Sequence, residues 1–524
     1  MKLRTIVKIA ITSSVVLLCS GFALYSFFRL SAAEGQKDFN LYELVPSTTS
    51  AVFVTDDVLE FVAEVDELTC SKNQQYLYVS KLFSYLKQSL YALSEDTPHG
   101  LSRQMNQMLI SFHEPDNERN QVLYCRLGNG DKELVNRFVR KYISSLYPPK
   151  TFIYKGEEII IYPMADGDFL ACYLTSDFMA LSFQKKLIEN VIDAYKSGNS
   201  LADDSTFTGI RAPKKSAAAA TIYTRMQGMM GWTEFDMKMK DDFIYFSGIT
   251  HDADTCFAFI NQLRQQQSVK GFPGEVLPST AFYFSRQGIT DWVSLLSYGN
   301  AQGQSVPART SEVQNRDKEF SRYLMENAGQ DLVACLFQRE DTLQGAAAVL
   351  SLSVADVTEA ERMLRALVNA ASADEGRRNP RITFCYTVNK AYPIYRLPQT
   401  TLFEQLTSFA EPTLDVYAAF YGGRLLLAPD ADALAHYIRQ LDKGEVLNGA
   451  MAYQTGMDHL SDSYHFMLMA DFDHIFQQSE NHVRFVPDFF LRNADFFRHF
   501  TLFVQFACAD GMVYPNIVLK YKSE

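Results

Sequence analysis

A repeated pattern constrains the fold of this 524-residue chain more than any other feature of its sequence. The stretch LVPSTTSAVFV at Leu44–Val54 is echoed by VLPSTAFYFS at Val276–Ser285. A longer match aligns residues 171–230 with 417–476 without gaps, at a constant offset of 417 − 171 = 246. A constant offset of this kind is typical of internal repeats, so we expect one domain type to occur twice in tandem.

The matched segments predict the same elements in the same order. In each, two apolar runs are joined by a tight turn, Thr175–Asp177 or Tyr421–Gly423, which predicts a β-hairpin. An amphipathic helix follows and ends at a glycine, Gly198 or Gly444, suited to a left-handed cap. The two copies therefore share a scaffold of alternating hairpins and helices.

Strands are expected to outnumber helices in each copy. Late hairpins have their turns at Asp241-Asp242 and Asp510-Gly511. Taken with the elements before them, they give the order β-α-β-α-β-β-β-β-α-β-β. We predict an α+β fold, two tandem copies of a mainly antiparallel sheet packed with helices and preceded by one transmembrane helix. Asp254–Gln267 is expected to be a connecting helix.

The N-terminus predicts the compartment. Ile9–Phe28 runs for twenty residues without a charge, which is long enough for a helix to span a bilayer. The basic residues Lys2, Arg4 and Lys8 precede it and favour a cytoplasmic N-terminus. We expect an uncleaved, single-pass anchor in the inner membrane and a periplasmic body. Cleavage at the small residues Ser31–Ala33 is the alternative.

The chain therefore divides into four predicted parts, with enough apolar content (47%) for at least two cores. These parts are residues 1–40 with the cytoplasmic N-terminus, anchor and linker, 41–252 as the first repeat, 253–275 as the connecting helix and linker, and 276–524 as the second repeat.

The charge balance disfavours nucleic-acid partners. The chain has 49 basic and 61 acidic residues, a net charge of -12, which repels nucleic acid and anionic lipid headgroups unless basic residues are concentrated locally. The short basic run RAPKK, Arg211–Lys215, is better explained as a solvated linker than as a binding site.

The eight cysteines suggest neither a structural metal nor a cofactor site. They form no CxxC pair and no zinc-finger spacing. Cys70 lies in the polar stretch LTCSKN, where a disulfide is an open alternative. Five others lie in apolar, strand-like runs, where a thiol behaves as a small buried hydrophobe: Cys125, Cys172, Cys335, Cys385 and Cys508.

No catalytic motif is present: we find no GxSxG, GxGxxG, Walker loop, HExxH or EF-hand pattern. The loop HEPD, His113–Asp116, could supply an acid or base, but the second copy has no histidine there, so surface chemistry is favoured. Six histidines in the C-terminal third, with Asp471 and Asp473, match no metal-site spacing. These six are His436, His459, His465, His474, His482 and His499. We therefore assign no catalytic, cofactor-binding or metal-binding residues.

An aromatic segment in the second copy has two interpretations. His482–Phe500 contains six phenylalanines in nineteen residues. Such a segment could bind a partner or lie against a membrane. A helix packed over its own sheet is the favoured interpretation.

The charged N-terminus, the single span, LVPST at Leu44–Thr48 and two paired blocks carry a resemblance. The blocks are LSFQKKLIENVIDAYKSGNSL and LAPDADALAHYIRQLDKGEVL. Together they resemble a family of bacterial envelope proteins catalogued as a domain of unknown function. The resemblance implies an exported, duplicated protein and no particular activity.

Three hypotheses follow for function. The first is a non-catalytic, membrane-anchored periplasmic scaffold that binds an envelope protein or a ligand. The alternatives are an envelope hydrolase with a site between the copies, and a carrier of apolar ligands with a large apolar cavity.

Overall fold

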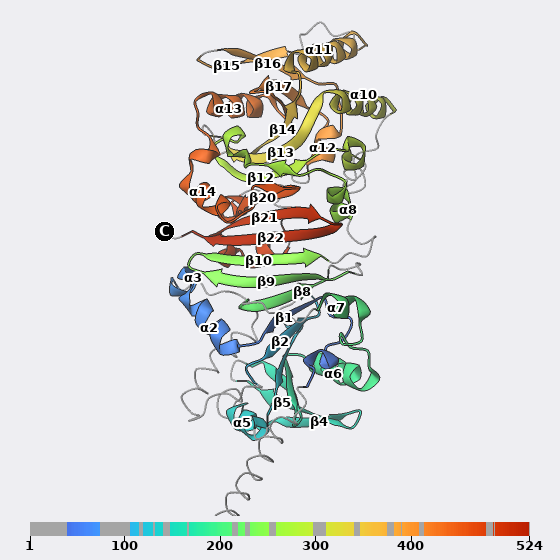
Figure 1. Ribbon diagram of the computed structural model, residues 1–524, viewed down its shortest axis with the longest axis vertical. Helices are drawn as coiled ribbons and strands as arrows, with labels where there is room; N and C mark the ends of the chain where they lie inside the picture. The colour runs from blue at the N-terminus through green and yellow to red at the C-terminus, as the bar shows by residue number, and fades with distance from the viewer. Residues whose placement is uncertain are drawn as a thin grey trace, which may run out of the picture.

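The computed structural model of the chain shows an α+β protein with antiparallel pairing, as the sequence predicts, but its main strands form one large sheet where the sequence predicts a sheet in each of two copies (Figure 1). The sheet runs along the longest axis of the molecule. The structure describes residues 39–522 except for 74–104, 115–118, 129–130, 140–146, 165–166, 212–217, 226–230, 251–257, 297–310, 340–345, 375–381, 389, 408–412, 478–485 and 487. The expected anchor lies outside the described residues, and none of the helices within them is long and apolar enough to cross a membrane.

The first half of the sheet has the strand order β4-β5-β6-β7-β3-β2-β1-β8-β9-β10, with every neighbouring pair antiparallel. Its strands are β1 (Ala51–Thr55), β2 (Met108–Phe112), β3 (Gln121–Arg126), β4 (Lys150–Tyr154), β5 (Glu157–Pro163), β6 (Phe169–Leu174), β7 (Phe178–Ser182), β8 (Ala220–Thr224), β9 (Thr233–Lys240) and β10 (Phe243–Thr250).

The second half has the order β15-β16-β17-β18-β14-β13-β12-β20-β21-β22, again antiparallel throughout. Its strands are β12 (Ala281–Gly288), β13 (Ala328–Gln338), β14 (Ala346–Val354), β15 (Ile382–Tyr386), β16 (Ala391–Arg396), β17 (Tyr417–Tyr421), β18 (Arg424–Ala428), β20 (Phe466–Asp471), β21 (Phe500–Ala509) and β22 (Met512–Tyr521). A separate pair joins β11 (Val269–Lys270) to β19 (Ser463–Tyr464).

Among the described residues the two halves thus place strands of corresponding rank in the same order across the sheet. The order expected for each copy was short by two strands. It omitted β2 and β13, and it counted two strands rather than three after the amphipathic helix. The apolar run MLISF before the HEPD loop does predict the strand β2, but the expected order left it out.

The halves meet edge to edge through antiparallel pairing of β10 with β22. Ser247 lies opposite Asn516. Each of these residues lies five positions after the second residue of its hairpin turn, Asp242 or Gly511, so each pairs with its own counterpart. The junction therefore has the local symmetry of a two-fold dimer interface.

Helices cover both faces of the sheet. The helices of the first half are η1 (Leu41–Leu44), α2 (Val58–Glu67), α3 (Thr69–Lys72), α5 (Asp131–Phe138), α6 (Lys185–Ser197) and α7 (Ser205–Ile210). The connecting helix α8 (Ala258–Arg264) lies within the range expected for it. The second half has η3 (Pro273–Val276), α10 (Ser311–Asn327), α11 (Val357–Asp374), α12 (Leu402–Leu406), α13 (Ala431–Asp442), η4 (Leu447–Gly449), α14 (Met451–Met457), α15 (Phe472–Phe476), α16 (Asp488–Arg492) and α17 (Ala494–Phe497).

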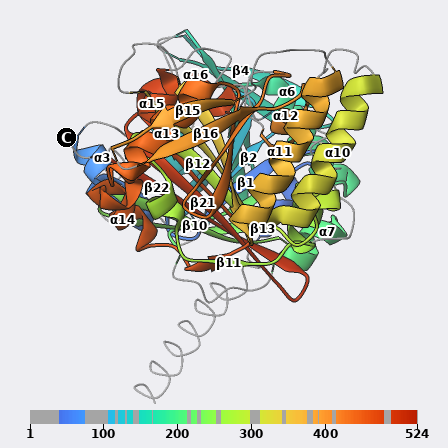
Figure 2. The same cartoon turned by 90° about the horizontal axis from the view of Figure 1, so that it is seen from above.

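One hydrophobic core runs across both halves. It takes Phe61 from α2, Ile244 from β10, Leu519 from β22 and Leu364 from α11. The opposite face carries separate clusters under α6 and under α13. Figure 2 shows α10 and α11 side by side, away from α13. Because the junction strands contribute to the shared core, the two halves form one continuous body.

Both predicted glycine caps are confirmed. Gly198 follows α6 with φ 66° and ψ 29°, and its N–H donates to Ala194 O. Gly444 has φ 76° just after α13. The hairpin turn at Asp510-Gly511 also has positive φ at both residues, the geometry of a type I′ turn.

The phenylalanine-rich segment packs against its own domain, the favoured interpretation. Phe497 and Phe500 are buried in the shared core. The ring of Phe490 lies 5.0 Å from that of Phe472 on α15. Although Cys70 lies in a polar stretch of sequence, its thiol on α3 is buried in the shared core. The described cysteines are unpaired.

Candidate functional sites

The histidine of the HEPD loop is part of an interior hydrogen-bond chain. Ser111 Oγ lies 2.9 Å from His113 Nε2 and 3.1 Å from the Tyr124 hydroxyl. Burial lowers the pKa of His113 to about 4, so the ring is neutral at neutral pH. Ser111 is fully buried, so its hydroxyl has no access to a substrate. The arrangement resembles a Ser–His pair only in its distance, and it serves to satisfy buried polar atoms. Glu114 is exposed and accepts a hydrogen bond from Asn120, while Pro115 and Asp116 lie outside the described residues.

The C-terminal histidines that the structure describes are dispersed. They are His436 on α13, His459 after α14, His465 between β19 and β20, His474 on α15, and His499 before β21. No three His, Cys, Asp or Glu side chains within the described part of the chain are placed to hold a metal ion.

Asp471 and Asp473 do not form a ligand pair. Asp471 caps α15 by accepting from the backbone N–H groups of Asp473 and His474. Its carboxylate also lies 2.6 Å from Lys522 Nζ. Burial alone would raise the pKa of Asp471, but hydrogen bonds from His474 and Lys522 hold it below its usual value. The cluster therefore fastens the end of the chain to β20.

A second charged cluster holds the linker against the second half. Asp331 on β13 lies between Arg286 on β12, at 3.0 Å, and Arg424 on β18, at 3.3 Å. Arg286 donates onward to Gly271 O at 2.8 Å, and Arg424 to Ser351 Oγ at 2.6 Å. Since both guanidinium groups already donate to internal acceptors, the cluster is a structural clamp and offers no anion site.

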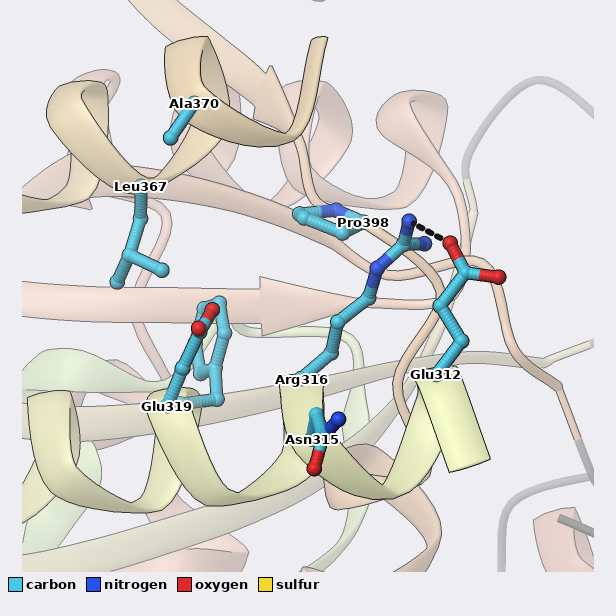
Figure 3. A pocket seen from close by; sticks show the side chains of 8 residues that line it. Glu312, Asn315, Arg316, Glu319, Leu367, Ala370 and Pro398 are labelled. Carbon is cyan, nitrogen blue, oxygen red and sulfur yellow. Dashed lines mark hydrogen bonds and ion pairs between the residues drawn. The ribbon is translucent and has the colours of Figure 1, made fainter. Parts of the chain in front are cut away.

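A small polar pocket of about 210 Å³ opens between α10 and α11. It is lined by Glu312, Asn315, Arg316, Glu319, Phe320, Leu367, Ala370 and Pro398. Figure 3 shows the Arg316 side chain extending towards Pro398, with its guanidinium paired to Glu312 at 2.7 Å. The volume is below the ~300–1,000 Å³ of typical ligand pockets. The lining offers no nucleophile beside a base, so the pocket does not support catalysis.

The junction between the halves brings together aromatic rings. The His459 ring lies 4.2 Å from that of Phe243, and its Nδ1 lies 3.2 Å from the Tyr245 hydroxyl. These contacts join the segment after α14, in the second half, to β10, in the first. The three rings therefore pack the two halves against each other at their junction.

The two ends of the sheet are more unusual than any of these clusters. Of the described residues, none pairs with the outer edge of β4 or of β15. On β15, Phe384 is 54% exposed and Tyr386 is 70% exposed, and Val388 in the loop beyond is 97% exposed. Alternate side chains of a strand face opposite sides of the sheet, and Cys385, between Phe384 and Tyr386, is accordingly buried against Ala435 of α13.

The backbone of β15 is also available for pairing. Thr387 N–H donates to Lys390 O, which makes this pair a hydrogen-bonded one. Hydrogen-bonded and non-bonded pairs alternate along an antiparallel ladder, so Ile382, Phe384 and Tyr386 direct their N–H and C=O groups outward. Pro393, opposite Phe384, lacks an N–H and fits this register. The edge thus combines outward-facing backbone groups, which pair with none of the described residues, with exposed aromatic side chains on one face.

The sequence did not single out these edges as a site. Both were expected as hairpins, and their first strands contain the similar stretches TFIY (Thr151–Tyr154) and TFCY (Thr383–Tyr386). That likeness was the signal available, but the local pattern does not tell an edge strand from a central one.

Comparison with protein-family models, curated proteins and solved structures finds no match to this chain.

Proposed function

We propose that this chain is a non-catalytic, membrane-anchored scaffold of the bacterial envelope, which binds an extended segment of a partner protein along the outer edge of β15. One observation carries the proposal: at the end of a continuous sheet lies a strand whose outer edge pairs with none of the described residues and which has exposed aromatic side chains. Unpaired edges are templates for the addition of a further strand.

Within its own five residues β15 has none of the charges that usually protect edge strands. The five residues of β15 are Ile382–Tyr386, ITFCY, all uncharged. Natural proteins commonly protect an edge with lysine or proline. At the other end β4 itself begins with Lys150 and has Lys155 in its turn, whereas the basic residues nearest β15 in the sequence, Arg381 and Lys390, lie outside the strand. The β15 edge is therefore the better candidate for a protein partner.

We further propose that the body arose by tandem duplication and is held in the periplasm by Ile9–Phe28. The shared strand order, the cap glycines Gly198 and Gly444, and the self-paired junction of β10 with β22 support duplication. The charge bias around Ile9–Phe28 supports the topology.

The test is quantitative affinity capture of the full-length tagged protein from solubilised membranes. The main variant is Phe384→Pro, because this N–H points away from β16 and its loss leaves the ladder intact. Losing one hydrogen bond and one aromatic contact costs about 2 kcal/mol, so recovery of the partner should fall at least ~10-fold.

Ile153→Pro is the matched control, since it makes the same change at the outward-facing edge of β4. It should leave capture unchanged. Equal recovery of the same partner by wild type and Phe384→Pro, with both variants as stable as wild type, would refute the proposal.

A further inference from the structure

The β4 end of the molecule gathers exposed apolar side chains. Tyr147 is 73% exposed, Ile153 71%, Phe169 57% and Phe152 41%. They lie on or beside β4, β5 and β6, and Figure 1 places β4 at the opposite end of the long axis from β15. A single exposed apolar residue needs no explanation, but a group of them at one place on the surface does.

Lysines surround these apolar side chains. Those at this end are Lys150, Lys155, Lys185, Lys186 and Lys196. Three nearby carboxylates are neutralised in ion pairs with lysines, Asp193 with Lys155, Glu189 with Lys185, and Glu157 with Lys196. Lys150 is exposed at the start of β4. Glu158, opposite Ile153, is a fourth, exposed carboxylate at this end, so these five lysines exceed these four carboxylates by one positive charge, against an overall charge of -12.

The described chain begins beside this end. The Phe39 ring lies 4.8 Å from that of Phe178 on β7 and 5.9 Å from that of Tyr195 on α6. The next residue of α6, Lys196, donates from Nζ to the carbonyl of Lys155 in the β4–β5 turn at 2.7 Å. One turn of α6 therefore connects the start of the body to the β4 edge.

The tether to the predicted anchor is short. Residues 29–38 lie between the span Ile9–Phe28 and Phe39, and ten residues extend at most about 36 Å. If Ile9–Phe28 spans the membrane, Phe39 and the adjacent β4 end stay within that distance of the bilayer. No such limit applies to β15, at the far end of the sheet.

We propose that the β4 end rests on the bilayer surface, with Tyr147, Phe152, Ile153 and Phe169 in the interfacial region and the lysines at the lipid headgroups. This inference rests on the anchor in the proposed function. Aromatic rings and lysines are the side chains that membrane interfaces favour, because each has an apolar part and a polar end. The contact orients the body: the twenty described strands of the sheet, spaced ~4.8 Å apart, carry β15 up to about 90 Å from the membrane.

The experiment uses the full-length protein in vesicles of phosphatidylcholine brominated in its acyl chains, mixed with anionic lipid. Ile153→Trp places a fluorescent indole in the proposed contact, and Val388→Trp places one at the β15 end. Both positions are largely exposed, so neither change should disturb packing. The native Trp232 and Trp292 are buried, and wild type supplies their signal for subtraction.

Interfacial apolar residues lie about 5–10 Å into the headgroup and acyl boundary, so the indole of Ile153→Trp should shift to the blue and lose roughly half its emission to bromine. The indole of Val388→Trp should keep its emission. Adding Lys150→Glu and Lys186→Glu to Ile153→Trp should reduce the quenching, since both exchanges turn lysine–lipid attraction into repulsion.

Flotation of the same vesicles tests the anchor separately. Protein that floats while neither indole is quenched, or while both are quenched equally, overturns the end-on contact and leaves the anchor standing. A blue shift at position 153 without quenching would mean that a second copy covers this end, which also overturns it. Protein that does not float removes the anchor and the inference together.

Discussion

The buried hydrogen-bond chain at His113 predicts a specific loss of stability in mild acid. Ser111 Oγ lies 2.9 Å from His113 Nε2 and 3.1 Å from the Tyr124 hydroxyl, and in the tautomer that carries its proton on Nδ1 the neutral ring accepts a hydrogen bond at Nε2. Protonation turns that nitrogen into a donor, so it can no longer accept from Ser111. Burial holds the pKa of His113 at about 4, below the ordinary value near 6.5.

The sign of the effect follows from that difference. A histidine whose pKa is lower in the folded state contributes stability that is complete above pH ~6.5 and is lost as pH falls towards 4. A shift of about 2.5 units corresponds to at most ~3.4 kcal/mol. Because part of the ring is exposed, we expect about 2 kcal/mol.

The assay is denaturant unfolding of the full-length protein in a Trp292→Phe background, which leaves the buried Trp232 to report on the first half. In His113→Gln, the side-chain oxygen replaces Nε2 as the acceptor and does not titrate. Between about pH 7 and about pH 4.5, the free energy of unfolding of wild type should fall by about 2 kcal/mol more than that of His113→Gln. His436→Gln, which alters a histidine in the other half, should behave as wild type. Equal pH dependence in wild type and His113→Gln would refute the reasoning.

Three further predictions concern the caps, the charged clamp and the topology. Gly198→Val and Gly444→Val should each destabilise the protein by about 1–2 kcal/mol, because φ is positive at both positions. Gly209→Ala should instead stabilise it by about 0.5 kcal/mol, because this glycine has an ordinary φ and open space for a Cβ. Thermal unfolding measures all three changes. Asp331→Asn should lower the free energy of unfolding by about 3 kcal/mol at neutral pH, because it removes the negative charge that pairs with Arg286 and Arg424. Burial tends to raise the pKa of Asp331 but Arg424 and Arg286 lower it overall, so wild type should lose this contribution only as pH falls below about 4. A reporter fused to the C-terminus should be active only when it is of the type that works outside the cytoplasm; activity of a cytoplasm-only reporter would contradict the topology.

Local sequence rules predicted the turns and helix ends of this fold well. The positive φ values at Gly198, Gly444 and Asp510-Gly511 are costly for most residues, so the residue type itself marks the position. The amphipathic faces of α6 and α13 were also recognisable, because their buried residues recur with helical period. The α+β class followed from these elements.

The arrangement of the sheet could not be predicted in the same way. The pairing of β10 with β22 joins strands more than 250 residues apart, and the alternation of each strand is satisfied by any antiparallel neighbour. For the same reason nothing local distinguishes β15, at the end of the sheet, from β17 inside it. The candidate binding edge is a consequence of long-range pairing, and it becomes visible only when every strand has its place.

Site-specific photocross-linking in intact cells tests the central claim most directly. A photoreactive phenylalanine analogue at Phe384, on the outer edge of β15, should give one discrete adduct with a partner protein. The same analogue at Val293, which is 59% exposed outside the edge strands, should give none. Adducts at neither position, or the same adducts at both, would contradict the proposal that this chain binds its partner through the end of its sheet.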